Sequence, residues 1–134
     1  RDAQESRWLG DVYKRQDIQR IANHLVSKNI PIILFEKDPR QKITDLIFDD
    51  LSCISLHWKN DIEAISKSVK NNIAIQGNLN PMILSKSDEI IHQEVQRICS
   101  IMSEYPGFIF NLGHGITPDI NPQKVQTMIK AARE

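Results

Sequence analysis

The sequence predicts an α/β fold in which one helix precedes four units of strand and helix. Two observations carry this prediction. Four short apolar runs are rich in β-branched residues, and between them apolar residues recur three and four positions apart. Alternation of this kind is typical of a parallel sheet with right-handed crossover connections. The chain has 134 residues, which is room for one domain.

The expected strands comprise residues 31–35, 53–57, 72–76 and 108–112. Short unbroken apolar runs are typical of strands that are buried on both faces, as in parallel sheets. We therefore expect the four strands to pair in sequence order, all parallel, with their carboxyl ends at one edge. That edge would gather Lys37, His57, Asn78 and His114.

Five segments have the apolar spacing of helices. Their apolar residues are Ile18, Ile21, Ala22 and Leu25; Ile43, Leu46, Ile47 and Leu51; Ile62, Ile65 and Val69; Ile90, Ile91, Val95, Ile98 and Met102; and Val125, Met128, Ile129 and Ala132. Asn121 is a favoured N-cap for the last helix, and Pro122 suits the first helical position. Ser85, with Asp88 three residues later, is a weaker start signal for the fourth helix.

Residues 1–16 differ from the rest of the chain. They are mostly polar and charged, with Trp8 and Tyr13 isolated among them. Because no apolar stripe is visible, we interpret residues 1–16 as a leader that is disordered or not native to the protein. Residues 17–134 form the folded domain in this interpretation.

Composition excludes several classes of protein. Hydrophobic residues make up 40% and charged residues 25%, as in ordinary globular domains. The formal net charge is zero, so no overall field favours nucleic acid or an anionic membrane as a partner. No apolar run reaches the roughly 18 residues that span a membrane, and no signal peptide pattern is present, so we expect a cytoplasmic location. Cys53 and Cys99 lie in apolar segments, which favours small buried hydrophobes over a zinc pair.

The stretch from Phe110 to Asp119 is the most informative. An apolar strand leads into His114, which Gly113 and Gly115 flank. Two glycines leave the backbone free of side chains where a ligand could approach. A histidine after the carboxyl end of a strand lies where α/β barrels keep their chemistry. The alternative is a loop histidine that packs between its glycines.

Two blocks carry a resemblance to a known family. They are Gln76-Gly77-Asn78-Leu79-Asn80-Pro81 and Asn111-Leu112-Gly113-His114-Gly115. With residues 31–38 and 54–58 they are collinear with the last four strands of uroporphyrinogen decarboxylases, and residues 17–134 resemble the C-terminal half of that family. The resemblance implies half of a TIM (β/α)8 barrel. A complete barrel takes about 250 residues, so its other half would lie outside this chain.

The resemblance also implies an activity. Enzymes of this family are carboxy-lyases of porphyrin and haem biosynthesis that remove the carboxyl groups of the four acetate side chains of uroporphyrinogen III, giving coproporphyrinogen III. It implies no cofactor, a tetrapyrrole substrate, a homodimer for the full-length enzyme, and neither nucleic acid nor membrane as partner. The family's N-terminal arginine segment and the aspartate that binds the pyrrole N–H groups match nothing here. We therefore expect this fragment to be inactive alone, and a truncated fragment without catalytic activity is the alternative hypothesis.

By resemblance, His114 is a substrate-binding residue, and no catalytic residue or metal ligand maps onto this chain. Candidate pocket-lining residues are Gln76, Gly77, Asn78, Gly113 and Gly115. The alternative for Asn78 is a turn in which its side chain bonds its own loop. Lys37 could bind a substrate carboxylate, but a solvated lysine is an equal alternative, and its acidic neighbours Glu36 and Asp38 weaken an anion site.

Two departures from the family pattern concern charge. His57 precedes Trp58 where the family usually has Asp-Trp, and Asn80 also replaces an aspartate. A neutral histidine cannot supply a negative charge, so any ion pair at this strand end would be lost or rearranged. We expect Trp58 to lie in the core or an interface.

A related barrel, the cobalamin-dependent methyltransferases, is the remaining alternative. Those enzymes have a His-x-Cys after the fifth strand and a cysteine between the last glycines. Here the corresponding positions hold Phe35-Glu36-Lys37 and His114. Without a thiolate there is no soft-metal site to activate a thiol, which favours the decarboxylase resemblance.

Overall fold

The computed structural model describes residues 3–40, 42–69 and 73–134, with the backbone alone for residues 3–12. The helices are α1 (Ala3–Val26), α2 (Ile62–Val69), α3 (Asp88–Ile101) and α4 (Pro122–Ala131), with the short 3-10 helices η1 (Ile43–Leu46) and η2 (Pro81–Ser85). The strands are β1 (Ile33–Phe35), β2 (Cys53–Ser55), β3 (Ala74–Leu79) and β4 (Phe108–Leu112).

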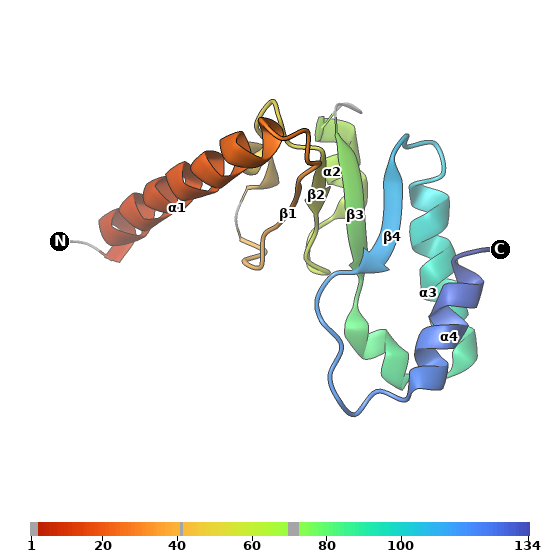
Figure 1. Cartoon of the computed structure of the whole chain (residues 1–134). Coiled ribbons are helices and arrows are strands. Elements are labelled where there is room, and N and C mark those ends of the chain that lie inside the picture. The colour runs from red at the N-terminus through yellow and green to blue at the C-terminus, as the bar shows by residue number, and fades with distance from the viewer. Residues whose placement is uncertain (1–2, 41, 70–72) are drawn as a thin grey trace.

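The four strands form one sheet in the order β1-β2-β3-β4, and all neighbours are parallel (Figure 1). This confirms the predicted order and direction. The third strand runs further than predicted, to Leu79, while residue 72 lies outside the described residues. Because the strands are parallel, their carboxyl ends share one edge, and the loops that follow them meet there.

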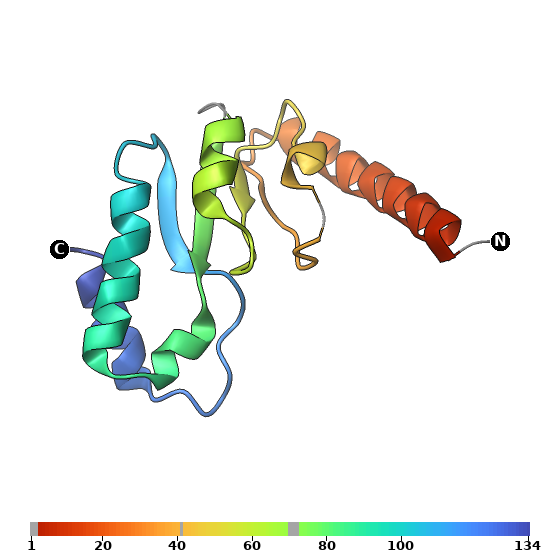
Figure 2. The ribbon, with the colours of Figure 1, turned by 180° about the vertical axis from the view of Figure 1, so that it is seen from behind.

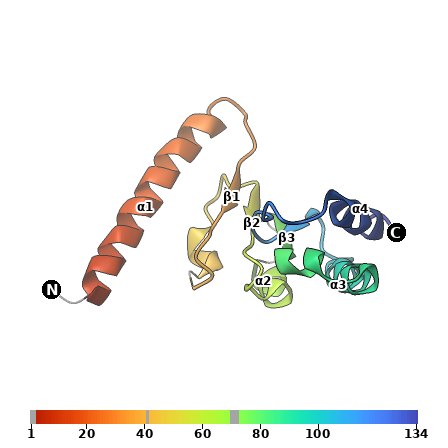
Figure 3. The same cartoon turned by 90° about the horizontal axis from the view of Figure 1, so that it is seen from below.

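One face of the sheet is covered by α2 and α3, with α4 beside α3 (Figures 2 and 3). The Gln96 amide of α3 donates a hydrogen bond of 2.6 Å to the carbonyl of Ala131 in α4. No helix of the described residues covers the opposite face. Ile33, Phe35 and Ile109 are therefore 53%, 44% and 42% exposed there, so the prediction of strands buried on both faces is wrong for β1 and β4.

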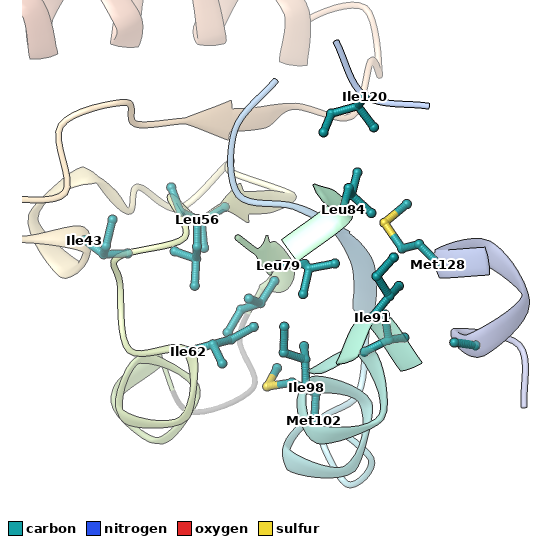
Figure 4. Packing of buried hydrophobic residues seen from close by; sticks show 14 of the residues in the cluster. Ile43, Leu56, Ile62, Leu79, Leu84, Ile91, Ile98, Met102, Ile120 and Met128 are labelled. Atoms are coloured by element: carbon teal, nitrogen blue, oxygen red, sulfur yellow. The ribbon is translucent and has the colours of Figure 1, made fainter. Parts of the chain in front are cut away.

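The core lies between the sheet and its helices. Ile91, Val95 and Ile98 of α3 recur three and four positions apart and are buried, whereas Ile90 is 41% exposed. Ile54 and Ile75 of the strands are buried as well. Figure 4 shows Leu79 within this cluster, between Leu56 and Ile91. Burial of each such side chain contributes about 1.5–3 kcal/mol, so this layer provides most of the stabilisation.

The caps explain where the last two helices begin. Asn121 accepts a hydrogen bond from the Gln123 N–H, as its sequence position predicts, and Pro122 follows it. The predicted start signal at Ser85 is wrong. Ser87 caps α3 instead, by accepting a hydrogen bond from the Ile90 N–H, and Ser85 ends η2.

The predicted second helix is reduced to the single turn η1. The chain leaves the helical region at Ile47, which has φ −81° and ψ 131°. Its apolar residues still pack inward, since Ile43 and Leu51 are buried. The spacing therefore predicted the buried face of this segment correctly and its helical length wrongly.

Helix α1 extends away from the sheet (Figures 1 and 3). Ala22 is buried, while Tyr13 and Ile21 are 64% and 63% exposed. The helical spacing over residues 18–25 is confirmed, and the helix continues toward the N-terminus as far as Ala3. The leader interpretation of residues 1–16 stays a prediction. Among the described residues, no helix is both long enough and apolar enough to cross a membrane.

Candidate functional site

A cavity of about 510 Å³ lies on the uncovered face of the sheet, toward the carboxyl ends of its strands. It is lined by Ile33, Phe35, Ser55, Gln76, Asn111, Leu112, His114, Gly115, Ile116, Val125 and Met128. Most of these walls are apolar, and a few polar side chains are set among them. This composition is typical of sites that bind an organic molecule and orient it through polar contacts.

His114 and Gln76 are the two sequence-predicted side chains that the cavity brings together. His114 lies in the loop after β4, where its side chain is exposed. Gln76 lies on β3, and its amide donates a hydrogen bond of 3.1 Å to the Ser55 hydroxyl on β2. Ser55 was missed by the sequence interpretation, although a hydroxyl inside a buried apolar strand was a usable signal. Gly115 also lines the cavity, as expected.

Gly77, Asn78 and Gly113 are outside the residues that line this cavity. Asn78 is 6% exposed, and its amide donates to the carbonyls of His57 (3.2 Å) and Asn60 (2.8 Å). Its side chain thus joins β3 to the loop after β2, rather than bonding its own loop. Any substrate contact of Asn78 remains a prediction, but its amide is already used within the protein.

The two glycines have packing reasons. A Cβ at Gly113 would lie 2.3 Å from the backbone nitrogen of Trp58, and the Gly113 carbonyl accepts a 3.2 Å hydrogen bond from that same N–H. Gly77 has φ +136°, a conformation that side chains rarely adopt, and a Cβ there would lie 3.1 Å from the Leu56 oxygen. Both glycines let neighbouring strands and loops approach closely.

His57 contacts His114 and does not line the cavity. It is 7% exposed, stacks on Trp58 with ring centroids 5.4 Å apart, and meets His114 edge-on with centroids 5.9 Å apart. Burial, then the neighbouring charges of His114 and Lys59, lower the pKa of His57, while Asp38 opposes them. Trp58 is half-buried in this stack, and the Lys59 ammonium lies 5.2 Å from its ring.

The loop after β1 has its own charge pairs. The buried Glu36 carboxylate accepts a 2.7 Å hydrogen bond from the Lys14 ammonium and another of 2.8 Å from the Asp38 N–H. Arg40 pairs with Asp38 at 2.7 Å. Lys37 is exposed beside them and is not among the cavity residues, so its role toward an anion stays a prediction.

Asn80 keeps a structural role that its carbonyl oxygen can fill. That oxygen accepts a hydrogen bond of 3.1 Å from the Met82 N–H and caps η2. An amide can therefore serve here as well as a carboxylate.

The cysteines and carboxylates do not form a cluster. Over the part of the chain that the structure describes, no three His, Cys, Asp or Glu side chains are placed to share a metal ion. Cys53 is buried and Cys99 half-buried, and both are free. Burial raises the pKa of each thiol, which keeps it in the unreactive protonated form.

Comparison with known proteins identifies the family of the chain. Residues 13–134 match the uroporphyrinogen decarboxylase (URO-D) family. The uroporphyrinogen decarboxylase of Vesicomyosocius okutanii is 38% identical over 101 residues, which are 75% of this chain and 29% of that protein. Those of Tolumonas auensis and Legionella pneumophila are 34% and 35% identical over 89% and 91% of this chain, and 34% of each relative is covered. The chain thus spans about a third of the length of these curated relatives.

Proposed function

The chain belongs to the uroporphyrinogen decarboxylase family, and we propose that it supplies the last four strand–helix units of a barrel that decarboxylates uroporphyrinogen to coproporphyrinogen. The remaining units come from protein outside these 134 residues. The parallel order β1-β2-β3-β4 supports this placement in a barrel, because consecutive barrel strands pair in that order.

The observation that carries the proposal is that His114 and Gln76 line one cavity whose other walls are mainly apolar. A tetrapyrrole is a large, mostly apolar ring system with carboxylates at its rim. Apolar side chains such as Ile33 and Phe35 would contact the rings, and the imidazole and amide would bond polar groups of the substrate.

The decarboxylation needs more functional groups than the residues that line this cavity provide. Protonation of a pyrrole carbon creates a cation, and that cation accepts the electron pair released when carbon dioxide leaves the acetate. The site must stabilise the cation and hold the other carboxylates. We propose that His114 binds substrate, while the groups that stabilise the cation lie in the N-terminal part of the barrel. Groups that act as a unit lose far more than additively when most are absent, so this chain alone should not turn over.

Reconstitution tests the proposal. The 134-residue chain, and the same chain joined to the N-terminal two-thirds of the Tolumonas auensis relative, are given uroporphyrinogen, and the oxidised products are followed by porphyrin fluorescence. We expect no product from the chain alone and coproporphyrin from the joined protein. His114→Ala in the joined protein should lower kcat/KM by about 10-fold or more, as loss of one charge-assisted hydrogen bond implies.

The matched control is His92→Ala, because His92 lies on α3 in an exposed pair with Glu134, away from the cavity. Turnover by the isolated chain would contradict the division of the site. Equal activity of the joined protein and its His114→Ala variant would remove His114 from the substrate site. We further propose that the joined enzyme is a cytosolic homodimer, which light scattering and cell fractionation would check.

A further inference from the structure

We propose that neutral His57 is a positioning residue for His114, holding the His114 ring toward the cavity from behind. The inference rests on the proposed function of the cavity. The ring edge of one imidazole meets the face of the other at 81°, and the centroids are 5.9 Å apart. His57 does not line the cavity, so it acts through His114.

The surroundings of His57 fix its ring. Trp58 stacks on one side at an interplanar angle of 30°, and only 7% of His57 is exposed. The Asn78 amide bonds the His57 carbonyl, which ties its backbone to β3. The backbone N–H of Trp58, in turn, donates to the Gly113 carbonyl, next to His114 in sequence. The pair of histidines is therefore held by contacts that join the loop after β2 to β3 and to the loop after β4.

A backbone hydrogen bond requires the neutral form of His57. Its Nδ1 accepts a hydrogen bond of 3.1 Å from the Lys59 N–H. An imidazolium carries hydrogen on both nitrogens and cannot accept, so the ring must be neutral with its proton on Nε2. Protonation would break this bond and free the ring from its loop.

Charges around the ring favour the same neutral form. Burial has the largest effect on the pKa of His57 and lowers it, followed by His114 from the loop after β4 and Lys59 from its own loop. Asp38, in the loop after β1, is the opposing charge. Acid that protonates His57 would therefore break the hydrogen bond from the Lys59 N–H. It would also place a positive charge on His57, close to the Lys59 ammonium and the His114 ring.

Nuclear magnetic resonance of the 134-residue chain tests the geometry without any activity. Long-range 1H–15N spectra of labelled histidines should show His57 as the Nε2–H tautomer at pH 7.5. Its midpoint should lie below the ordinary value of about 6.5, and His114→Gln should raise it. His24→Gln, an exposed change on α1, is the matched control and should leave it unmoved. An Nδ1–H tautomer, an imidazolium, or no response to His114→Gln would overturn the proposal.

Two variants of the joined protein distinguish a role of His57 in positioning His114 from a role in folding alone. His57→Phe keeps a ring against His114 and cannot titrate, so its KM should stay within about 2-fold of the parent. His57→Asn keeps an acceptor for the Lys59 N–H but removes the ring, and its KM should rise about 3- to 10-fold at similar kcat, as loss of one contact of about 1 kcal/mol implies. Equal KM values for the two variants would overturn the proposal. An inactive joined protein would refute the proposed function alone, because the resonance experiment still decides the role of His57.

Discussion

The two faces of this sheet differ more than the sequence of its strands suggests. On the helix-covered face, Ile54 and Ile75 are wholly buried against α2, α3 and the loops between them. On the opposite face, Ile33, Phe35 and Ile109 are comparably apolar and yet about half exposed. The same residue type, isoleucine, is thus core on one side and surface on the other.

The contrast separates a face that is covered within the described residues from one that is left open. One face has its helical layer within the 134 residues, so burial there stabilises the chain by itself. The other face leaves Ile33, Phe35 and Ile109 exposed, and exposed apolar patches mark binding surfaces. The candidate cavity lies on this second face.

The largest expected effect comes from truncating the same residue type on each face. Ile54→Ala should lower the free energy of unfolding of the chain by about 3–4 kcal/mol, because it leaves a cavity in the covered core. Ile33→Ala, at a position 53% exposed, should cost less than about 1 kcal/mol. Urea unfolding followed by circular dichroism measures both.

The same two substitutions can be measured in the joined protein. If further barrel units cover the open face, the cost of Ile33→Ala should rise toward that of Ile54→Ala. Equal costs in the isolated chain would mean that the open face is already covered there. A small cost in the joined protein would mean that it stays uncovered.

A smaller effect is expected from adding one methyl group beside His114. Gly113→Ala would place a Cβ 2.3 Å from the Trp58 nitrogen, so backbone must shift, at a cost of about 2–3 kcal/mol. Gly115→Ala is the matched control, since a Cβ there would have no atom within 4 Å and would face the open cavity. Thermal unfolding should separate the two variants, and similar midpoints would show that the Trp58 loop yields easily.

The smallest effect concerns helix α1. Lys14→Met removes the partner of the buried Glu36 carboxylate and should cost about 0.5–1 kcal/mol, since the lysine itself is half exposed. Deletion of residues 1–12 keeps this pair and should change stability by less than about 0.5 kcal/mol. Thermal midpoints measure both changes. A large loss on deletion would show that the first twelve residues pack against the domain and would contradict the leader interpretation.

Much of the fold could be predicted because it depends on local patterns. Apolar runs and helical spacing predicted four parallel strands in order and the helices α2, α3 and α4, and Asn121 with Pro122 predicted the start of α4. Helix length after β1 could not be predicted, since Ile43 and Leu51 can be buried by a single turn and an extended segment as well as by a helix. At the site, Gln76, His114 and Gly115 lie at the cavity whereas Gly77, Asn78 and Gly113 lie outside it, and the role of each toward substrate stays a prediction.

The fold class, the family and the strand edge where the candidate residues gather follow from local sequence, since periodicity and motif spacing are properties of neighbours in the chain. Which face of that edge each side chain occupies depends on tertiary packing. The close packing of Gly77 on Leu56, the hydrogen bond from the Trp58 N–H to the Gly113 carbonyl and the edge-on contact of His57 with His114 all join segments that are far apart in sequence. Such contacts depend on how closely loops pack, and packing is set by the whole core rather than by any local pattern.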